Sequence, residues 1–319
     1  MATKTIKKIK NIKDLNFAIV VTTYKRNELL DTLLDSIKNL NYLPAKTFII
    51  DNDKSKDCEK LCDSYSKYFE IEYVPMKENT GGAGGFSHGT DLAHKQGYEW
   101  LWLMDDDVAV LEDSIEKIFP WTNDYKFIQP SKYNFDGSDF YWQYNFLVKL
   151  GIPNPIASAP FDSSGFKFMN TCCFEGAFFN RDIVNRIGIP DARFFIYWDD
   201  TIYGYLATKF TKGILIEDKC LRRTRDIKNM KIGSERKLNS TSDMVRYYIF
   251  RNRGYMAKYF KQYGDYNPFL FHFGTFLTFC KELIRITITG NIKTMWHSIG
   301  ECFRGMKDAK KIFYKETHK

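Results

Sequence analysis

Apolar runs alternate with amphipathic segments along the first hundred residues. Four short runs are almost wholly apolar, and the segments between them place apolar side chains three or four residues apart. The runs are Phe17–Val21, Thr47–Ile50, Ile71–Val74 and Trp100–Met104, and the helical segments are 27–39, 57–67 and 86–97. This order predicts a β-α-β-α-β-α-β arrangement with a parallel sheet that is buried on both faces.

The pattern becomes mixed after residue 126. Aromatic-rich strands are expected around Phe140–Trp142 and Phe166–Phe168, helices near 180–187 and after Trp198, and another strand at Gly213–Ile216. A basic stretch follows, which we expect to be mobile. Long helical patterns then run to the end of the sequence. We therefore expect an α/β protein with a basic N-terminal extension (1–15), a Rossmann-like domain with a mostly parallel central sheet (16–220) and a basic, helical C-terminal region (221–319).

The net charge of +8 is concentrated at the two ends of the chain. Residues 1–14 contain five lysines and one aspartate, and the region after Asp218 is rich in arginine and lysine. Basic ends can attract nucleic acid or an anionic membrane surface. The sequence has no helix-turn-helix, zinc-finger or RNP motif, so we expect membrane-surface association and no nucleic acid.

Cysteine usage and apolar segments bear on the compartment. The seven cysteines form no Cys-x-x-Cys pair, which favours a reduced, cytoplasmic setting over a disulfide framework. No signal peptide opens the sequence, and the apolar run from Tyr266 to Cys280 is too short and interrupted for a bilayer span. We expect a cytoplasmic protein that is peripheral at the inner face of the membrane.

Three consecutive aspartates, Asp105 to Asp107, follow the fourth apolar run. Carboxylate oxygens suit Mg²⁺ or Mn²⁺, which keeps positions open for phosphate oxygens. Alternate side chains of an extended segment point the same way, so Asp105 and Asp107 form the expected pair and Asp106 points elsewhere. A solvated turn that caps the next helix is the alternative. Ligands bind beyond the carboxyl ends of strands in open α/β sheets, which favours the metal site.

Two further segments carry candidate chemistry. Four glycines between Asn79 and Phe86 predict a flexible loop before a helix, where backbone N–H groups can approach an anion; a plain linker is the alternative. Asp199 and Asp200 follow Trp198, which would place a base beside an aromatic platform for a sugar. The alternative is that one aspartate caps the next helix.

Five motifs occur together: Thr23-Tyr-Lys-Arg26, Asp51-Asn52, Asn79-x-Gly-Gly-x-Gly-Gly-Phe86, Asp105-Asp-Asp107 and Phe195-Ile-Tyr-Trp-Asp-Asp200. Together they resemble the family 2 glycosyltransferases with the GT-A fold. Within that family they look most like bacterial galactofuranosyltransferases of envelope galactans, capsules and O-antigens, and next like dTDP-rhamnosyltransferases. The resemblance covers residues 16 to 218, and the glycine segment and the Trp-Asp-Asp motif are its most specific parts.

The resemblance implies roles for these residues in an inverting, metal-dependent transfer. Asp200 would be the catalytic base, and Trp198 and Asp199 would contact the acceptor. Mn²⁺ or Mg²⁺ would be held by Asp105 and Asp107, with Asp218 standing where relatives often have a histidine. The donor nucleotide sugar would lie among Thr23, Tyr24, Arg26, Asp51, Asn52, Asn79, Gly81, Gly82, Gly84, Gly85, Phe86 and Asp106.

Further expectations concern the acceptor, the C-terminal helices and competing functions. The resemblance implies a UDP-sugar donor and a lipid-linked glycan acceptor; relatives also carry a third acidic residue where this chain has Ile202. The apolar stripe with Phe276, Phe279 and Ile284 predicts an interfacial helix, with core packing or a homo-oligomer as alternatives. The competing functions are rhamnosyl transfer, a sugar nucleotidyltransferase and a non-catalytic nucleotide-sugar-binding protein.

Overall fold

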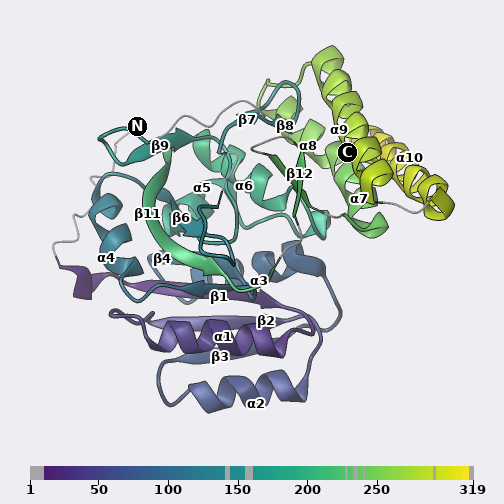
Figure 1. Cartoon of the computed structure of the whole chain (residues 1–319). Helices are drawn as coiled ribbons and strands as arrows, with labels where there is room; N and C mark the ends of the chain where they lie inside the picture. The colour runs from purple at the N-terminus through teal and green to yellow at the C-terminus, as the bar shows by residue number, and fades with distance from the viewer. Residues whose placement is uncertain are drawn as a thin grey trace.

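A curved sheet runs through the middle of the molecule, with helices on both faces (Figure 1). The computed structural model describes residues 11–140, 144–154, 161–226, 229–232, 236–239, 241–289 and 292–315. Four helices from the C-terminal part of the chain gather at one end of the molecule (Figure 1). No helix in these described ranges combines the length and the apolar character that a membrane span requires.

The first half of the sheet forms where the apolar pattern predicts it. After a short 3-10 turn (Ile12–Asp14), its elements are β1 (Phe17–Thr23), α1 (Asn27–Lys38), β2 (Lys46–Asp51), α2 (Lys56–Tyr65), β3 (Ile71–Pro75), α3 (Gly81–Lys95) and β4 (Trp100–Asp105). Strands β3, β2, β1 and β4 are neighbours in this order, and all three pairings are parallel. The predicted β-α repeat is therefore confirmed.

Strand β1 shows why this half of the chain has continuous apolar runs. Phe17, Ile19 and Val21 pack in the core beneath α1 and α2, whereas Ala18 and Val20 pack on the opposite face, in the core with α3. Alternate side chains of a strand point to opposite faces, so a strand that is covered on both sides must be apolar throughout.

The second half of the sheet is mixed. Its elements are β5 (Val108–Val110), α4 (Ser114–Ile118), η2 (Phe119–Asn123), β6 (Phe127–Tyr133), β7 (Phe146–Leu147), β8 (Ile152–Pro153), β9 (Phe166–Met169), β10 (Ala177–Asn180), α5 (Arg181–Ile187), η3 (Ala192–Phe194), α6 (Asp199–Thr208) and β11 (Gly213–Arg223). The full order is β3-β2-β1-β4-β10-β6-β11-β5, with β9 on β11, and β10 runs antiparallel to β4 and β6.

Two predicted features of this half need correction. Phe140 lies outside any strand, and residues 141 and 142 lie outside the described ranges. Strand β11 does not stop at Ile216: register shifts let it continue along β6, and its last residues pair with β5. It therefore crosses residue 220, and Leu221 is buried rather than part of a mobile stretch. Further along, β12 (Asn229–Ile232) pairs with β13 (Arg236–Asn239).

The C-terminal helices share a core with the sheet domain. They are α7 (Asp243–Arg251), α8 (Arg253–Gln262), α9 (Pro268–Thr289) and α10 (Ile292–Lys315), as the helical patterns predicted. Met256 and Phe260 of α8 are fully buried in one cluster with Ile202 and Tyr205 of α6. Helices α7 and α8 therefore support the part of the chain that contains the second acidic motif.

Candidate functional site

The polar segments that follow the parallel strands meet at one edge of the sheet. In the strand register Thr23 lies beside Asp51, and Thr22 lies beside Asp105. After β3, the N–H of Met76 donates to the carbonyl of Asp51 at 2.9 Å. Parallel strands all end on the same side of a sheet, so residues far apart in the chain become neighbours here.

Asp106 is buried and orders the segment after β1. Its carboxylate accepts hydrogen bonds from Thr23 Oγ1 at 2.7 Å and from Arg26 Nη1 at 3.0 Å. Arg26 Nη1 also reaches Asp107 Oδ2 at 3.5 Å. Burial raises the pKa of Asp106, and its contacts with Arg26 and Thr23 limit the rise. Asp106 thus fixes a loop in which Tyr24 is exposed.

Asp51 and Asn52 order the loops after β2 and β3. Asp51 accepts hydrogen bonds from the backbone N–H groups two and four residues ahead and from the Tyr73 hydroxyl, all at 2.8 Å. Asn52 Oδ1 accepts from the N–H and the hydroxyl of Thr80 at 2.9 and 3.0 Å. Both oxygens of Asp51 are therefore engaged within the protein, and Asn52 fixes the approach to α3.

The glycine segment is helical, which corrects the prediction of a flexible loop. Helix α3 begins at Gly81, whose N–H donates to Asn79 Oδ1 at 2.9 Å. Gly81 has a φ of +70°, and a Cβ there would lie 2.0 Å from the carbonyl oxygen of Phe195. A Cβ on Gly82 would meet nothing within 4 Å. Within this first turn, Gly82 is the glycine at which a ligand could approach the backbone.

The later glycines serve close packing. A Cβ on Gly84 would lie 2.3 Å from Thr80, and one on Gly85 would lie 2.4 Å from Thr22. Phe86, which we expected in the donor pocket, is 3% exposed and packs in the core. These small residues let the start of α3 lie directly against β1 and the loop that precedes the helix.

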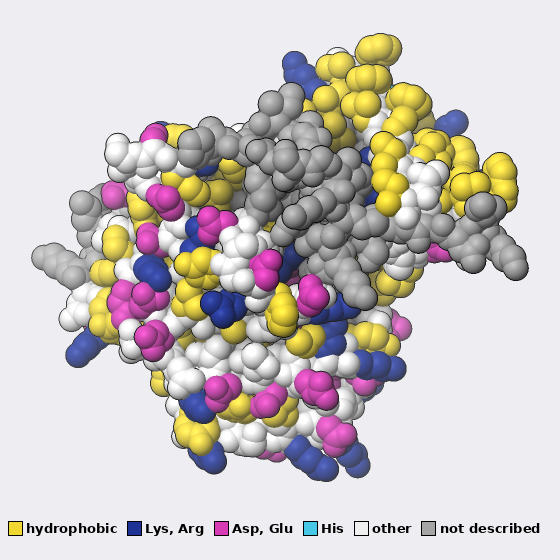
Figure 2. Space-filling model, in the orientation of Figure 1, with side chains coloured by type: hydrophobic (Ala, Val, Ile, Leu, Met, Phe, Trp, Pro, Cys, Tyr) yellow, Lys and Arg dark blue, Asp and Glu magenta, His cyan; other side chains and the backbone are white. Residues whose placement is uncertain are grey.

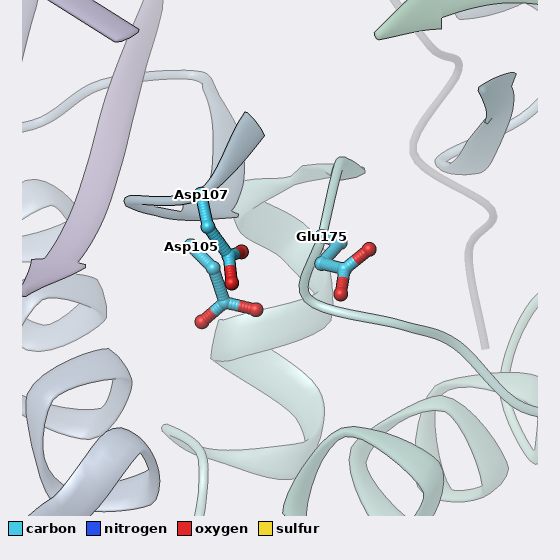
Figure 3. Close-up of side chains that lie close together, drawn as sticks. All are labelled: Asp105, Asp107 and Glu175. Atoms are coloured by element: carbon cyan, nitrogen blue, oxygen red, sulfur yellow. The ribbon is translucent and has the colours of Figure 1, made fainter. Parts of the chain in front are cut away.

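Three carboxylate side chains lie close together at the end of β4 (Figure 3). Asp105 and Asp107 flank Asp106, and Glu175 lies in the turn before β10. One ligand oxygen from each lies within 4.8 Å of the other two. Burial and the charges of Asp107 and Glu175 raise the pKa of Asp105 well above its usual range. Clustered oxygen ligands that repel one another fit a divalent cation such as Mg²⁺ or Mn²⁺.

Glu175 differs from the two aspartates because two cations hold it. It forms ion pairs with Lys132 and with Arg223, whose Nη2 lies 2.6 Å from Oε1. Burial opposes its ionisation, but the charges of Lys132 and Arg223 lower the pKa of Glu175 to about 2. The ring of Phe140 packs on both cations, with its centroid 4.6 Å from Lys132 Nζ and 4.1 Å from Arg223 Cζ. Glu175 is therefore ionised at every physiological pH.

Asp199 and Asp200 form the first turn of α6, and neither is its N-cap, because Trp198 holds that position. Asp200 Oδ1 accepts from the N–H of Thr201 at 2.5 Å and from its hydroxyl at 3.2 Å. Burial raises the pKa of Asp200 to about 6, against these hydrogen bonds. Burial and the charge of Asp200 raise the pKa of Asp199 to about 8. Burial raises the pKa of both neighbouring carboxylates toward neutrality, which suits proton transfer, and Asp200 is the candidate base.

A sequence profile for the family described as Glycosyl transferase family 2 matches residues 18–188 of the 319. This match covers more than half of the chain. The chain belongs to glycosyl transferase family 2.

Curated relatives of this family 2 chain are glycosyltransferases. It is 26% identical over 253 residues to galactofuranosyltransferase GlfT1 of Mycolicibacterium smegmatis, which covers 74% of this chain and 81% of the relative. GlfT1 of Mycobacterium tuberculosis is also 26% identical over 253 residues, with 75% and 81% covered. The amylovoran biosynthesis glycosyltransferase AmsB of Erwinia amylovora is 29% identical over 110 residues, with 33% and 35% covered. The protein is a glycosyltransferase.

Solved structures share its fold. The mannosyltransferase PcManGT from Pyrobaculum calidifontis, in complex with GDP-Man and Mn²⁺, has a TM-score of 0.53 at 12% identity and covers 94% of this chain and 88% of its own. TarS 1–349 of S. aureus in complex with UDP-GlcNAc has a TM-score of 0.52 at 11% identity, with 93% and 81% covered. The GT-A fold that the sequence resemblance implied is thereby confirmed.

Asp218 does not join the acidic cluster. In the part of the chain that the structure describes, the three clustered carboxylates are those of Asp105, Asp107 and Glu175. The register of β11 shifts between Ile216 and Lys219, and Asp218 falls in this irregularity with an exposed side chain. The strand thus turns Asp218 toward solvent, which contradicts its expected place as a metal ligand.

Trp198 is a core residue rather than an open platform for a sugar. It is 6% exposed, and its indole N–H donates to the carbonyl of Ile249 at 3.1 Å. Ile202, where relatives carry an acid, is 2% exposed in the same cluster. Helix α6 packs this face against α8, so an apolar side chain fits at position 202.

Glu175, Lys132 and Arg223 escaped the sequence-based prediction. A signal for Glu175 was present, since the apolar run Ala177–Phe179 follows it closely and forms β10. Because β10 is antiparallel to β4, its start lies where β4 ends. Lys132 and Arg223 reach Glu175 through pairing of β6 with β11, which no local pattern indicates.

Proposed function

We propose that this glycosyltransferase transfers a sugar, preferably galactofuranose from UDP-galactofuranose, to a lipid-linked or cell-envelope glycan with inversion at the anomeric carbon. The observation that carries the proposal is the presence of two separate acidic centres. One is the carboxylate cluster at the end of β4, and the other is Asp200 at the start of α6. The similarity to the GlfT1 proteins supports the choice of donor.

The donor diphosphate would lie between the carboxylate cluster and the first turn of α3. Asp105 and Asp107 would hold Mn²⁺ or Mg²⁺, with Glu175 beside them. When bound, the cation would offset the negative charge that develops on the leaving diphosphate. The backbone around Gly82 is open to a phosphate oxygen, and the exposed ring of Tyr24 is available to the nucleoside.

Asp200 would act as the general base in a single displacement. Its carboxylate takes the proton from an acceptor hydroxyl, and the hydroxyl oxygen forms a bond to the anomeric carbon of the donor sugar. The bond between that carbon and the phosphate oxygen breaks, and UDP leaves with the electron pair. Glu175 and Lys132 both act electrostatically on Asp200, which supports a shared site for donor and acceptor.

A donor panel tests this function. The purified protein is incubated with Mn²⁺ or Mg²⁺ and UDP-galactofuranose, UDP-galactopyranose, UDP-glucose or dTDP-rhamnose, and free nucleotide is measured with and without envelope glycan acceptors. We expect release from UDP-galactofuranose that needs the metal and rises with acceptor. Release from dTDP-rhamnose alone would establish the rhamnosyltransferase alternative. Nucleotide binding without release from any donor would favour a binding protein and contradict the proposal.

We also propose that α9 and α10 lie on the membrane surface that carries the acceptor. Helix α9 directs Glu282 and Arg285 inward, where Glu282 is 1% exposed and lies 3.5 Å from Arg246 of α7. Its outward face is apolar, and apolar side chains gather on this end of the molecule (Figure 2). The exposed residues include Phe269, Phe273, Phe276, Ile284, Ile288 and Trp296. Exposed aromatic and aliphatic side chains along a helix suit a bilayer interface.

Vesicle binding tests this placement. The variant Phe273→Ser/Phe276→Ser should bind vesicles containing anionic lipids more weakly than the unaltered chain. Phe135→Ser is the matched control, because Phe135 is 53% exposed on the loop after β6. Unchanged binding of the double variant would contradict the proposal. Loss of a dimer in sedimentation, without loss of vesicle binding, would assign this face to a second copy of the chain.

A further inference from the structure

The segment that leads to Asp200 has an unusual backbone. Phe195, Tyr197 and Trp198 have φ values of 63°, 75° and 75°. In the described residues, only two other non-glycine positions have a positive φ. Such left-handed conformations are unfavourable for residues with a side chain and persist where surrounding contacts impose them. The contacts that hold this segment therefore determine where Asp200 lies.

One buried side chain of the C-terminal helices supplies three of these contacts. Asn252 lies at the junction of α7 and α8 and is 0% exposed. Its Nδ2 lies 2.9 Å from the carbonyl oxygen of Phe194, 2.8 Å from that of Ile196 and 2.9 Å from that of Tyr197. Arg251 Nη1 donates to Asn252 Oδ1 at 2.9 Å, which orients the amide with its N–H groups toward the segment.

The same segment also contacts the first turn of α3. The carbonyl of Phe195 accepts a hydrogen bond from the N–H of Ala83 at 3.1 Å. The absence of a Cβ on Gly81 leaves room for this carbonyl. The turn that Asn252 holds thus lies between the first turn of α3 on one side and Asp200 on the other.

We propose that Asn252 is a positioning residue for the transfer reaction. Its amide holds residues 194–198 in the left-handed turn that places the Asp200 carboxylate and supports the first turn of α3. Asn252 touches neither donor nor acceptor and acts through the backbone of this segment. The inference rests on the proposed function for the role of Asp200, whereas the restraint on the segment stands on the hydrogen bonds alone.

Isosteric replacement separates this role from simple packing. Asn252→Asp places a carboxylate oxygen against three carbonyl oxygens, and Asn252→Leu removes the donors while it fills the space. Misplacement of a catalytic group by about 1 Å lowers turnover about 10²-fold, so we expect kcat to fall by this order in both variants, more in Asn252→Asp. The KM for the donor should rise by a smaller factor, because the first turn of α3 loosens while the loops after β1 and β2 are unaffected.

The test combines hydrogen exchange with kinetics on the full chain. We expect faster amide exchange in residues 194–200 and in the first turn of α3 for both Asn252 variants, together with the loss of kcat. Ile286→Ala is the control, since Ile286 is buried in α9 outside this network. It should lower thermal stability without either change. If the Asn252 variants do not fold, Arg251→Ala, which removes the bond to Asn252 Oδ1 together with those to the carbonyls of Arg193 and Phe194, should show both effects.

Two results are distinguishable. Unchanged exchange in residues 194–200, or a kcat loss that Ile286→Ala reproduces at equal thermal stability, would overturn the role of Asn252. If the unaltered protein releases nucleotide from no donor, the proposed function fails, while the exchange measurement still decides whether Asn252 restrains the segment.

Discussion

The proposed donor side and the proposed acceptor side of this enzyme are built in different ways. On the proposed donor side, Thr23, Asp51 and Asp105 are the last residues of parallel strands, and the register of the sheet makes these strand ends neighbours. On the acceptor side, Asp200 begins a helix after a turn that Asn252 holds from the C-terminal helices. The sheet alone is enough to assemble the first side, whereas the second needs contacts between segments that are distant in the chain.

The acidic groups of the carboxylate cluster differ among themselves in how their charge is balanced. Asp105 has a raised pKa because burial and neighbouring carboxylates disfavour its charge. Glu175 has a lowered pKa because Lys132 and Arg223 surround it. A bound cation would therefore balance the charge of the two aspartates. The charge of Glu175 is already balanced by Lys132 and Arg223. The comparison predicts that metal removal affects the donor side first.

Removal of one clustered carboxylate gives the largest effect among the predictions that follow. Asp107→Ala should reduce turnover about 10²-fold. The substitution removes a ligand of the proposed cation, and this cation would stabilise the negative charge on the leaving diphosphate. The measurement is turnover as a function of Mn²⁺ concentration. A Mn²⁺ dependence equal to that of the unaltered enzyme would contradict the assignment of the cluster.

The pH dependence tests the acceptor side. The pKa of Asp200 is raised to about 6, and the base must be ionised, so kcat should be full above this value. Below it, kcat should fall about tenfold per pH unit as Asp200 takes up a proton. The measurement is kcat at saturating donor between pH 4.5 and 8. An acidic limb near pH 4 would mean that Asp200 is solvated or is not the base.

Gly81 and Gly82 test the contact between the first turn of α3 and the turn that leads to Asp200. Gly81→Ala should lower the free energy of unfolding by about 1–3 kcal/mol, because the φ is positive and the Cβ would overlap the Phe195 carbonyl. Gly82→Ala should raise it by up to about 1 kcal/mol, because it replaces glycine within a helix without a clash. Urea unfolding measures both. Equal effects would show that the contact between α3 and the turn is absent.

Asp218→Ala should have the smallest effect. Asp218 is exposed and lies outside the carboxylate cluster, so turnover should stay within about twofold of the unaltered enzyme. The same Mn²⁺ titration serves as the measurement. A marked increase in the Mn²⁺ concentration needed would restore Asp218 as a ligand.

This difference in construction explains how much could be predicted from the sequence. Strands β1 to β4 and helices α1 and α2 follow from apolar periodicity, and Asp105 and Asp107 follow from their place after a buried strand. The helical start of α3 was missed, because glycine disfavours a helix on its own and is accepted here for close packing with Thr22, Thr80 and Phe195.

The remaining misses share one cause. The burial of Trp198 and Ile202, the ion pairs of Glu175 and the amide contacts of Asn252 all depend on segments that meet only in the folded chain. Local propensity and spacing carry no information about such contacts. The roles of the individual donor and acceptor residues stay predictions until they are tested on the enzyme.

The central claim is that a donor centre around Asp105 and a base at Asp200 act separately in one transfer. Its most direct test measures binding and single-turnover release of UDP-galactofuranose in the same samples of the unaltered enzyme, Asp105→Ala and Asp200→Asn. The account predicts that Asp200→Asn binds the donor normally with metal but does not transfer the sugar, and that Asp105→Ala loses metal-dependent binding as well. Transfer by Asp200→Asn at the unaltered rate, or unchanged metal-dependent binding by Asp105→Ala, would contradict it.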